Sequence, residues 1–317
     1  MSWLCATTLL LAAALGAAQD EPAPVLVPIK AQPAEIMPLA AQAPLLDIVD
    51  TGRHLVAVGD RGNIVVSNDG RNWTQVESPV RAMLTAVSFA GPLDGWAVGH
   101  DAAILHTADG GRSWALQNFQ PELEKPLLDV LFIDRSHGFA VGAYGLYYRT
   151  ADGGQNWEQG TSPAGEQEAH LHAITRLASG VLLVVGEQGL VAQSTDGGAS
   201  WRRLHGPRDT ALYGALPQGP RGALVFGARG EVWGTADAAG GRWLALPSDT
   251  RASLFGGTVV GQDGGIVLVG AGGAARRMGG GRGSAALPAE RPVTLSAVTP
   301  FGDGLLAVGE SGVMRLR

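Results

Sequence analysis

The chain has 317 residues, of which 45% are hydrophobic and 16% are charged, and its formal net charge is -6. This apolar content is too high for a disordered protein, and the acidic balance argues against a nucleic-acid partner. Glycine occupies 47 positions, about twice its usual share of ~7%, without the strict period of collagen. This composition favours many tight turns and therefore many short strands.

An apolar, uncharged run at Leu4–Leu15 is followed by small residues and then by the polar Gln19. This order is typical of a secretory signal peptide, so we expect residues 1–18 to be removed by cleavage before Gln19. The single cysteine, Cys5, would leave with them, and export without disulfides fits a bacterial periplasm. Retention of the run as a membrane anchor is the alternative. Residues 19–44 are rich in proline, which excludes a helix and predicts an extended strap.

From residue 45 to residue 317 the chain repeats one unit seven times. Each unit opens with an apolar alternating run, continues into an apolar run that ends in Gly, and turns through a short hairpin that mostly ends in a second Gly. We interpret these segments as strands one, two and three, and we expect the hairpin glycines to take positive φ. The first glycines of the hairpins lie 39–44 residues apart, at Gly59, Gly99, Gly142, Gly186, Gly227, Gly270 and Gly309.

In the first five units the link between strands three and four carries the motif Ser/Thr-x-Asp-x-Gly-x-x-Trp, an Asp-box, with small changes of length in the first and fifth units. Its carboxylate can accept hydrogen bonds from the backbone of the turn that it begins, and its Trp can pack between neighbouring sheets. Five of the eight tryptophans occupy this position, so we interpret them as structural and not as a ligand cage. The Asp-box pairs are Asp69 with Trp73, Asp109 with Trp114, Asp152 with Trp157, Asp196 with Trp201, and Asp237 with Trp243.

Seven such units predict an all-β protein, a seven-bladed β-propeller of four-stranded Asp-box blades. The seventh unit stops at strand three, so we expect the extended segment Val25–Lys30 to supply its fourth strand and to close the ring. The chain would then consist of a signal peptide at 1–18, a strap with the closing strand at 19–44, and a propeller at 45–317.

The Leu-x-x-Val, Ala-Val-Gly and Asp-Gly-Gly-x-x-Trp pattern resembles that of the photosystem II stability/assembly factor family of propellers, over residues 45–317. The resemblance implies an assembly chaperone for a membrane protein that acts through a propeller surface, without a catalytic centre or a cofactor. We therefore expect a non-enzymatic periplasmic scaffold, monomeric on its own. Its client would be a membrane protein complex of the cell envelope, with a transporter as one candidate.

Partner binding is expected on the face that carries the hairpins between strands two and three and the links between blades, with the Asp-boxes on the opposite face. The residues between the hairpin glycines differ in every unit and mix charged with aromatic side chains, which hairpin geometry does not require. The expected contacts are Asp60, Arg61, His100, Asp101, Tyr144, Glu187, Gln188, Arg229 and Glu310, with Phe119 and Leu123 as apolar contacts in a blade link.

The alternative function is an Asp-box glycoside hydrolase of the sialidase kind. That chemistry needs three arginines around a carboxylate, a tyrosine nucleophile and an acidic proton donor, and the chain has only four tyrosines. A metal site is a further alternative: His170 and His172 alternate along strand one and could share a face, but the sequence identifies no third ligand. We therefore expect no metal.

Overall fold

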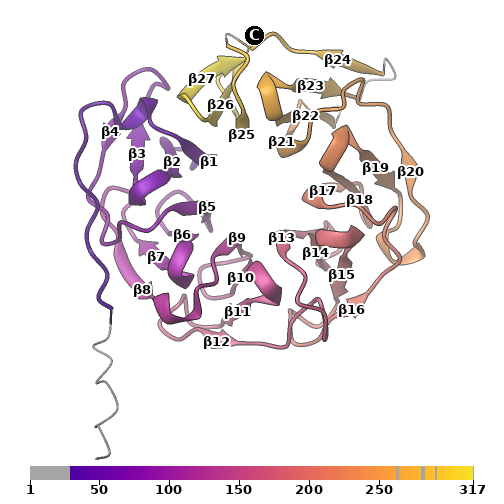
Figure 1. The fold of residues 1–317 in the computed structure, drawn as a ribbon, viewed down its shortest axis with the longest axis horizontal. Coiled ribbons are helices and arrows are strands. Elements are labelled where there is room, and N and C mark those ends of the chain that lie inside the picture. Colours follow the sequence, from indigo (N-terminus) through magenta and orange to yellow (C-terminus); the bar gives the residue numbers. More distant parts are fainter. Residues whose placement is uncertain (1–28, 262–263, 280–282, 290, 317) are drawn as a thin grey trace, which may run out of the picture. The chain divides into compact units, whose positions relative to one another are not determined.

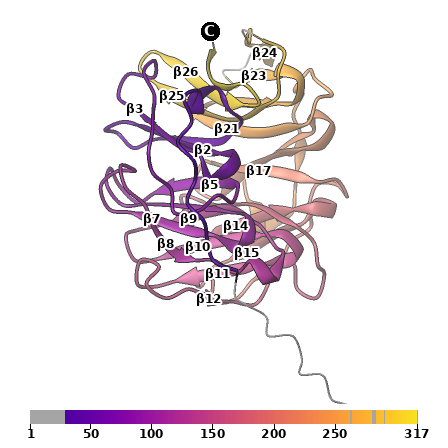
Figure 2. The ribbon, with the colours of Figure 1, turned by 60° about the vertical axis from the view of Figure 1, so that its left-hand side comes forward.

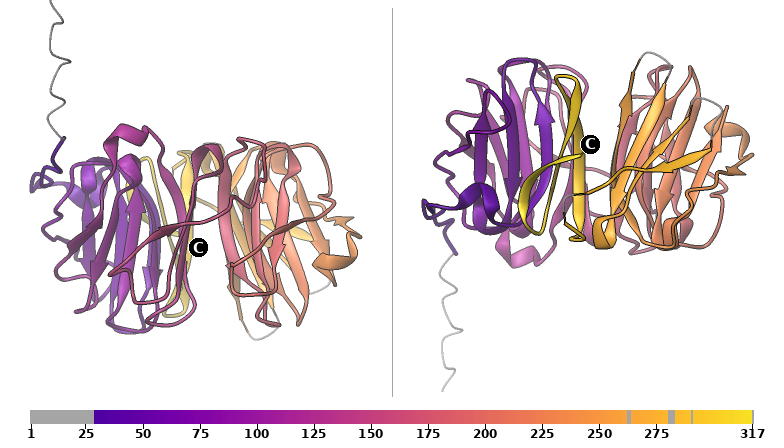
Figure 3. Two further views of the ribbon diagram at one scale, coloured as in Figure 1. Left: turned by 90° about the horizontal axis from the view of Figure 1, so that it is seen from below. Right: turned by 90° about the horizontal axis from the view of Figure 1, so that it is seen from above.

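The seven repeats fold into seven antiparallel sheets around a central channel in the computed structural model, which describes residues 29–261, 264–279, 283–289 and 291–316 (Figure 1, Figure 3). Six sheets have four strands, and the seventh has three among the described residues. The seven-bladed, all-β propeller is therefore confirmed. The predicted signal peptide lies outside the described residues.

Each blade runs outward from the channel in sequence order. The first strands, which line the channel, are β1 (Leu45–Asp50), β5 (Leu84–Phe89), β9 (Leu127–Phe132), β13 (Leu171–Arg176), β17 (Leu212–Gln218), β21 (Leu254–Val260) and β25 (Leu295–Phe301). The second strands are β2 (Leu55–Gly59), β6 (Gly95–Gly99), β10 (Gly138–Gly142), β14 (Leu182–Gly186), β18 (Gly222–Gly227), β22 (Gly265–Gly270) and β26 (Gly304–Gly309).

The outer half of each blade is shorter. The third strands are β3 (Ile64–Ser67), β7 (Ile104–Thr107), β11 (Tyr147–Thr150), β15 (Val191–Ser194), β19 (Val232–Thr235), β23 (Ala275–Met278) and β27 (Gly312–Leu316). The fourth strands are β4 (Thr74–Gln75), β8 (Ala115–Asn118), β12 (Glu158–Gln159), β16 (Arg202–Arg203), β20 (Leu244–Ala245) and β24 (Ser284–Ala286).

The helical elements of the described residues are all single 3-10 turns. Six of them form the hairpins between strands two and three: η2 (Asp60–Gly62), η3 (His100–Ala102), η5 (Ala143–Gly145), η6 (Glu187–Gly189), η7 (Ala228–Gly230) and η9 (Ala271–Gly273). The others are η1 (Ala40–Gln42) in the strap, η4 (Pro121–Leu123) in a blade link and η8 (Ala238–Gly240) in the fifth Asp-box.

Neighbouring blades are held together by seven apolar clusters, one at each contact between blades. Each Asp-box Trp packs into the cluster that joins its own blade to the preceding one. Trp114 is only 9% exposed and belongs to the cluster of blades 1 and 2. Trp157 meets Phe132 edge-on with ring centroids 5.8 Å apart, within the cluster of blades 2 and 3. The motif therefore stabilises the contact between blades as well as its own turn.

Hydrogen bonds explain the rest of the Asp-box. The Asp109 carboxylate accepts from the backbone N–H groups of Arg112 and Ser113, at 2.9 and 3.0 Å, and from the Ser113 hydroxyl at 2.6 Å. The Thr107 hydroxyl donates to the same carboxylate and accepts from Gly111 N–H. Although partial burial works in the opposite direction, these hydrogen bonds lower the pKa of Asp109 to about 2. The residue before the Trp is thus part of the motif, and Asn or Ser fills it in four boxes, at Asn72, Ser113, Asn156 and Ser200.

The hairpin glycines differ from the prediction. Gly59 has a φ of -177°, which is extended backbone, and only the closing Gly62 has a positive φ, of 71°. The first glycine is required for another reason, because a Cβ at Gly59 would strike the carbonyl oxygen of Pro44, the residue before strand one. That carbonyl accepts a hydrogen bond from Asp60 N–H at 3.1 Å, so it cannot move away.

The ring closes where blade 7 packs against blade 1. Leu306 and Val308 of β26 share one apolar cluster with Leu45 and Leu55 of blade 1. Of the predicted closing strand Val25–Lys30, only Ile29 and Lys30 are among the described residues, and these two lie in no strand; the rest of the segment lies outside the described part of the chain. The edge of β27 forms a single antiparallel bridge, between Leu316 and Ala289 of the preceding blade link.

The strap from Ala31 to Ala43 runs along the outside of the ring (Figure 1, Figure 2). The buried Asn63 side chain donates to the Ala40 carbonyl at 2.7 Å, and the Ala34 N–H donates to the carbonyl of Ser78. The η1 turn also packs against the start of β27. The strap thereby connects blade 1 to blade 7 without adding a strand.

Two truncations separate these closure models. A chain that begins at residue 31 keeps the strap and should have the same Tm as the full chain. A chain that begins at residue 45 loses the contact of Asn63 with the strap and the packing of η1. We expect the second truncation to lower Tm by several degrees, since a lost buried hydrogen bond alone costs about 1 kcal/mol. Thermal melts followed by circular dichroism measure this. An equal loss of Tm from both truncations would support Val25–Lys30 as the closing segment.

The Asp-box predicts a second stability effect. Asp109→Ala removes the acceptor of two backbone N–H groups and should cost about 1 kcal/mol, as the loss of a helix-capping side chain does. Ala108→Ser, at the exposed variable position of the same turn, is the matched control and should leave Tm unchanged. Chemical denaturation of both variants checks this, and equal stability of Asp109→Ala and wild type would contradict it.

Candidate functional site

The hairpins between strands two and three lie on the same face of the ring as the links between blades. Strand one begins beside the end of strand two, as the pairing of Leu45 with Gly59 shows, and strand four runs antiparallel to strand three and so ends there too. We call this the turn face. The Asp-boxes join strands three and four at the other ends of the strands and therefore lie on the opposite face.

The turn face carries every hairpin residue expected to contact a partner. Arg61, His100, Tyr144, Gln188, Arg229 and Glu310 are exposed there, while Asp60, Asp101 and Glu187 are half-buried. The two expected apolar contacts are placed differently. Phe119 packs against the cluster of blades 1 and 2, and Leu123 packs against that of blades 2 and 3, so both side chains are partly buried by the fold.

The second residue of each 3-10 hairpin takes the left-handed conformation. The sixth blade places Gly272 there, with a φ of 60°, but the other five such hairpins hold larger residues at this position. A non-glycine residue in this region costs of order 1 kcal/mol or more. These residues and their φ values are Arg61 (54°), Asp101 (60°), Tyr144 (53°), Gln188 (53°) and Arg229 (57°).

A β-bulge follows the first residue of strand one in every blade. The bulge gives strand one an extra residue, and this second residue lines a channel cavity of about 380 Å³. The seven residues at this position are Leu46, Thr85, Leu128, His172, Tyr213, Phe255 and Ser296.

Aromatic rings form a continuous arc at one side of the channel entrance. Tyr144 and His170 have ring centroids 4.6 Å apart, His172 and Tyr213 lie 5.0 Å apart, and Tyr213 and Phe255 lie 5.3 Å apart. Tyr144 is 48% exposed, and the ammonium of Lys125 lies 5.7 Å from its ring centroid. Such a surface can take up apolar and cationic groups of a ligand.

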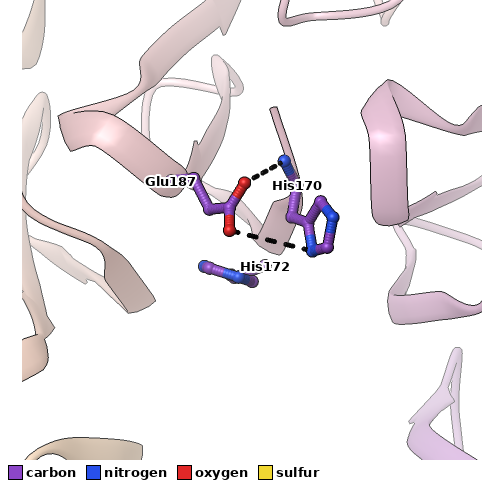
Figure 4. Close-up of side chains that lie close together, drawn as sticks. All are labelled: His170, His172 and Glu187. Carbon is purple, nitrogen blue, oxygen red and sulfur yellow. Dashed lines mark hydrogen bonds and ion pairs between the residues drawn. The ribbon is translucent and has the colours of Figure 1, made fainter. Parts of the chain in front are cut away.

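Figure 4 shows the Glu187 carboxylate beside the two histidines of this arc, with both of its drawn contacts going to His170. Glu187 Oε2 accepts from the backbone N–H of His170 at 3.1 Å, and its Oε1 lies 3.9 Å from His170 Nδ1. The sequence identifies no third donor beside His170 and His172, and the structure brings the Glu187 carboxylate to this pair. We call His170, His172, Glu187, Tyr144 and Tyr213 the channel mouth.

The sequence places Glu187 only in a hairpin and therefore does not predict that it meets His170 and His172. Its signal is present in the repeat, however. The residue after the first hairpin glycine donates its N–H to the residue before strand one in all seven blades, and in blade 4 these two residues are Glu187 and His170. Tyr213 and Phe255 could have been found similarly, since they occupy the position of His172 in the next two units.

Two acidic residues of the channel wall were also missed. The Asp47 carboxylate accepts from its neighbour Ile48 and from Val87 N–H of the next blade, and Asp129 accepts likewise from Val130 and from Ile174 N–H. Burial raises the pKa of Asp47 to about 6 and that of Asp129 to about 7, although the backbone donors favour the charged form. These carboxyls connect blade 1 to blade 2 and blade 3 to blade 4.

Known proteins resemble this chain in sequence and in fold. A sequence profile of the family described as Photosynthesis system II assembly factor YCF48 matches residues 65–124 and 116–277. No curated protein matches the sequence. None of the described helices is long and apolar enough to span a membrane.

Solved structures share the fold at low identity. A structure of YCF48 bound to a D1 peptide has 21% identity and a TM-score of 0.69, and the match covers 92% of this chain and 98% of that one. YCF48 from Cyanidioschyzon merolae has 18% identity and a TM-score of 0.69, covering 89% and 98%. A GH74 xyloglucanase from Xanthomonas campestris has 16% identity and a TM-score of 0.67, covering 90% of this chain but 53% of the enzyme.

The raised pKa values predict a pH effect on stability. Carboxyls whose folded pKa exceeds the unfolded value of about 3.9 stabilise the fold most below that pH, and this contribution is lost as the pH rises through 6 and 7. In the double variant Asp47→Asn/Asp129→Asn, one N–H in each pair loses its acceptor, so Tm should fall. The gap between the Tm of wild type and that of the variant should then narrow between pH 5 and pH 8, by about 2–4 °C for each kcal/mol of stability that the wild type loses.

Melting curves across this pH range give the measurement, and the difference between the two proteins cancels the titration of groups elsewhere. Asp196→Asn is the control, since hydrogen bonds from Ser200 and Ser194 lower the pKa of Asp196 to about 2, well below this pH range, and its gap should not change. A gap that stays constant or widens in the double variant would contradict the prediction.

Proposed function

The chain belongs to the Photosynthesis system II assembly factor YCF48 family, and we propose that it is a non-enzymatic assembly factor that holds a protein partner on its turn face. The YCF48 structure with a D1 peptide suggests the form of the partner, a peptide segment of a larger protein. The arc of aromatic rings at the channel mouth would provide the apolar contacts for such a segment.

The observation that carries this proposal is the set of side chains held in left-handed backbone at the hairpins. Glycine would be less strained at each position, as Gly272 illustrates, so hairpin stability does not account for Arg61, Tyr144 or Arg229. Strain of this kind is common at binding sites. The Asp-box face, in contrast, repeats one sequence whose residues are explained by the turn.

We further propose that the partner is a membrane protein complex of the cell envelope, for example a transporter, and that the protein meets it in the periplasm. The support is the apolar run at Leu4–Leu15, followed by residues suited to signal cleavage, together with the family. The proline-rich strap would then follow the cleavage site directly.

A glycoside hydrolase is the competing function, because the xyloglucanase shares the fold. This chain corresponds to 53% of that enzyme, so a shared fold does not supply the enzyme's remaining half. Assays with xyloglucan and with a fluorogenic sialoside separate the two functions. We expect no turnover, and turnover abolished by one acidic substitution would overturn the non-enzymatic proposal.

The binding face can be tested directly. Replacing Tyr144, Arg61 and Arg229 together by Ala should weaken partner capture at least tenfold, or ~1.4 kcal/mol, because buried anchors dominate interface energies. Tm should not change, since Ala keeps a Cβ in the same left-handed backbone. Capture from detergent-solubilised envelope, quantified by mass spectrometry, provides the measurement.

The matched control is the double variant Arg53→Ala/Arg71→Ala, which removes two exposed arginines from the opposite face. It should capture the partner as wild type does. A photo-crosslinking amino acid at position 144 should form a discrete adduct with that partner, whereas one at position 53 should not. If only the control variant loses capture, the turn face is the wrong one.

A further inference from the structure

Three donors meet at the channel mouth from separate segments of blade 4. His170 ends the blade link, His172 occupies the bulge of β13, and Glu187 begins the hairpin η6. Each side chain offers one ligand atom, and these atoms lie within 4.8 Å of one another (Figure 4). Two imidazoles and one carboxylate are the donor set of zinc sites that keep a coordination position free.

The ring of His172 is already oriented as a ligand. Its Nδ1 lies 2.9 Å from the carbonyl oxygen of Leu212, and because a carbonyl can only accept, Nδ1 must carry the proton. The lone pair is then on Nε2. Histidines that bind metals usually hold their second ring nitrogen on a carbonyl in this way. The neighbouring Tyr213 ring, 5.0 Å away, restricts the rotation of the imidazole.

Glu187 and His170 are placed with similar constraint. The His170 backbone N–H holds one oxygen of the Glu187 carboxylate, so the other oxygen is directed at the His170 ring. The 3.9 Å between Glu187 Oε1 and His170 Nδ1 is too long for a hydrogen bond. It exceeds by about 0.6 Å the ~3.3 Å between two ligands of a tetrahedral zinc ion. With 30% and 38% of these two side chains exposed, an ion can enter from solvent.

We propose that His170, His172 and Glu187 bind one divalent transition-metal ion, with Zn²⁺ the best match, and leave a coordination position open toward the channel. Imidazole with carboxylate suits Zn²⁺ and Co²⁺ better than Mg²⁺ or Ca²⁺, which prefer oxygen ligands alone. The site goes beyond the proposed function and does not rest on it, because ion binding needs no partner.

Titration calorimetry tests the site with the tag-free full chain, stripped by a chelator and titrated with ZnCl₂. We expect one ion per chain with a Kd of about 10 μM or tighter. Glu187→Gln keeps the size of the side chain and removes its charge, and His172→Phe keeps a ring beside Tyr213 and removes the nitrogen donors. Each should weaken binding at least tenfold.

The control is His137→Ala, which removes a histidine whose Nδ1 lies 3.0 Å from a carboxylate oxygen of Asp134 but which has no second histidine beside it. It should bind Zn²⁺ as wild type does. Co²⁺ adds a spectroscopic readout, since visible absorption of bound Co²⁺ should appear in wild type and in the control and be lost in Glu187→Gln.

Melting curves establish that each variant is folded. If His172→Phe does not fold, Glu187→Gln alone tests the metal site. The proposal is overturned if wild type takes up no stoichiometric Zn²⁺ at about 100 μM, or if Glu187→Gln binds as tightly as wild type.

Discussion

One backbone contact recurs in all seven blades and sets the geometry of the turn face. The N–H that follows the first hairpin glycine donates to the carbonyl of the residue before strand one, at 2.9–3.1 Å. Glycine is required because a Cβ would collide with that same carbonyl. The contact joins the hairpin to the blade link, and the bulge that follows it brings the next side chain into the channel. The residues that we assign to binding are therefore carried on backbone that the repeat itself holds in place.

The contacts between blades give the ring its stability. Each apolar cluster joins two neighbours only, so a blade depends on the next one, and the contact of blade 7 with blade 1 completes the series. The Asp-box contributes twice, through a turn held by its carboxylate and through a Trp that fills the cluster toward the preceding blade. Asp47 and Asp129 add polar contacts at the channel, where carboxyls from blades 1 and 3 accept N–H groups of blades 2 and 4.

The two faces of the propeller consequently differ in what their sequences must satisfy. On the Asp-box face, hydrogen bonding and packing account for Ser or Thr, Asp, Gly and Trp. On the turn face, the repeat requires only the glycines and leaves the residues between them free to vary. Tyr144, Arg61 and Arg229 are among the five side chains held in left-handed backbone at the second hairpin position, and the aromatic arc lies beside the first of them. A peptide-binding surface and a metal site in blade 4 are compatible, since both use the channel mouth.

The sequence by itself determined the features that arise from local, repeated interactions. The glycine spacing predicted seven blades, the Asp-boxes predicted their own turns, and strand alternation predicted which residues share a face, because each depends on neighbours within one unit. The reason for Gly59, the burial of Phe119 and Leu123, and the way the ring closes were decided by contacts between distant segments. So was the meeting of His170, His172 and Glu187. Their residue types are visible in the chain, but the hairpin and the blade link come together only when strand two pairs with strand one across a bulge. Such a register depends on the packing of the whole blade and cannot be assigned from residue spacing alone.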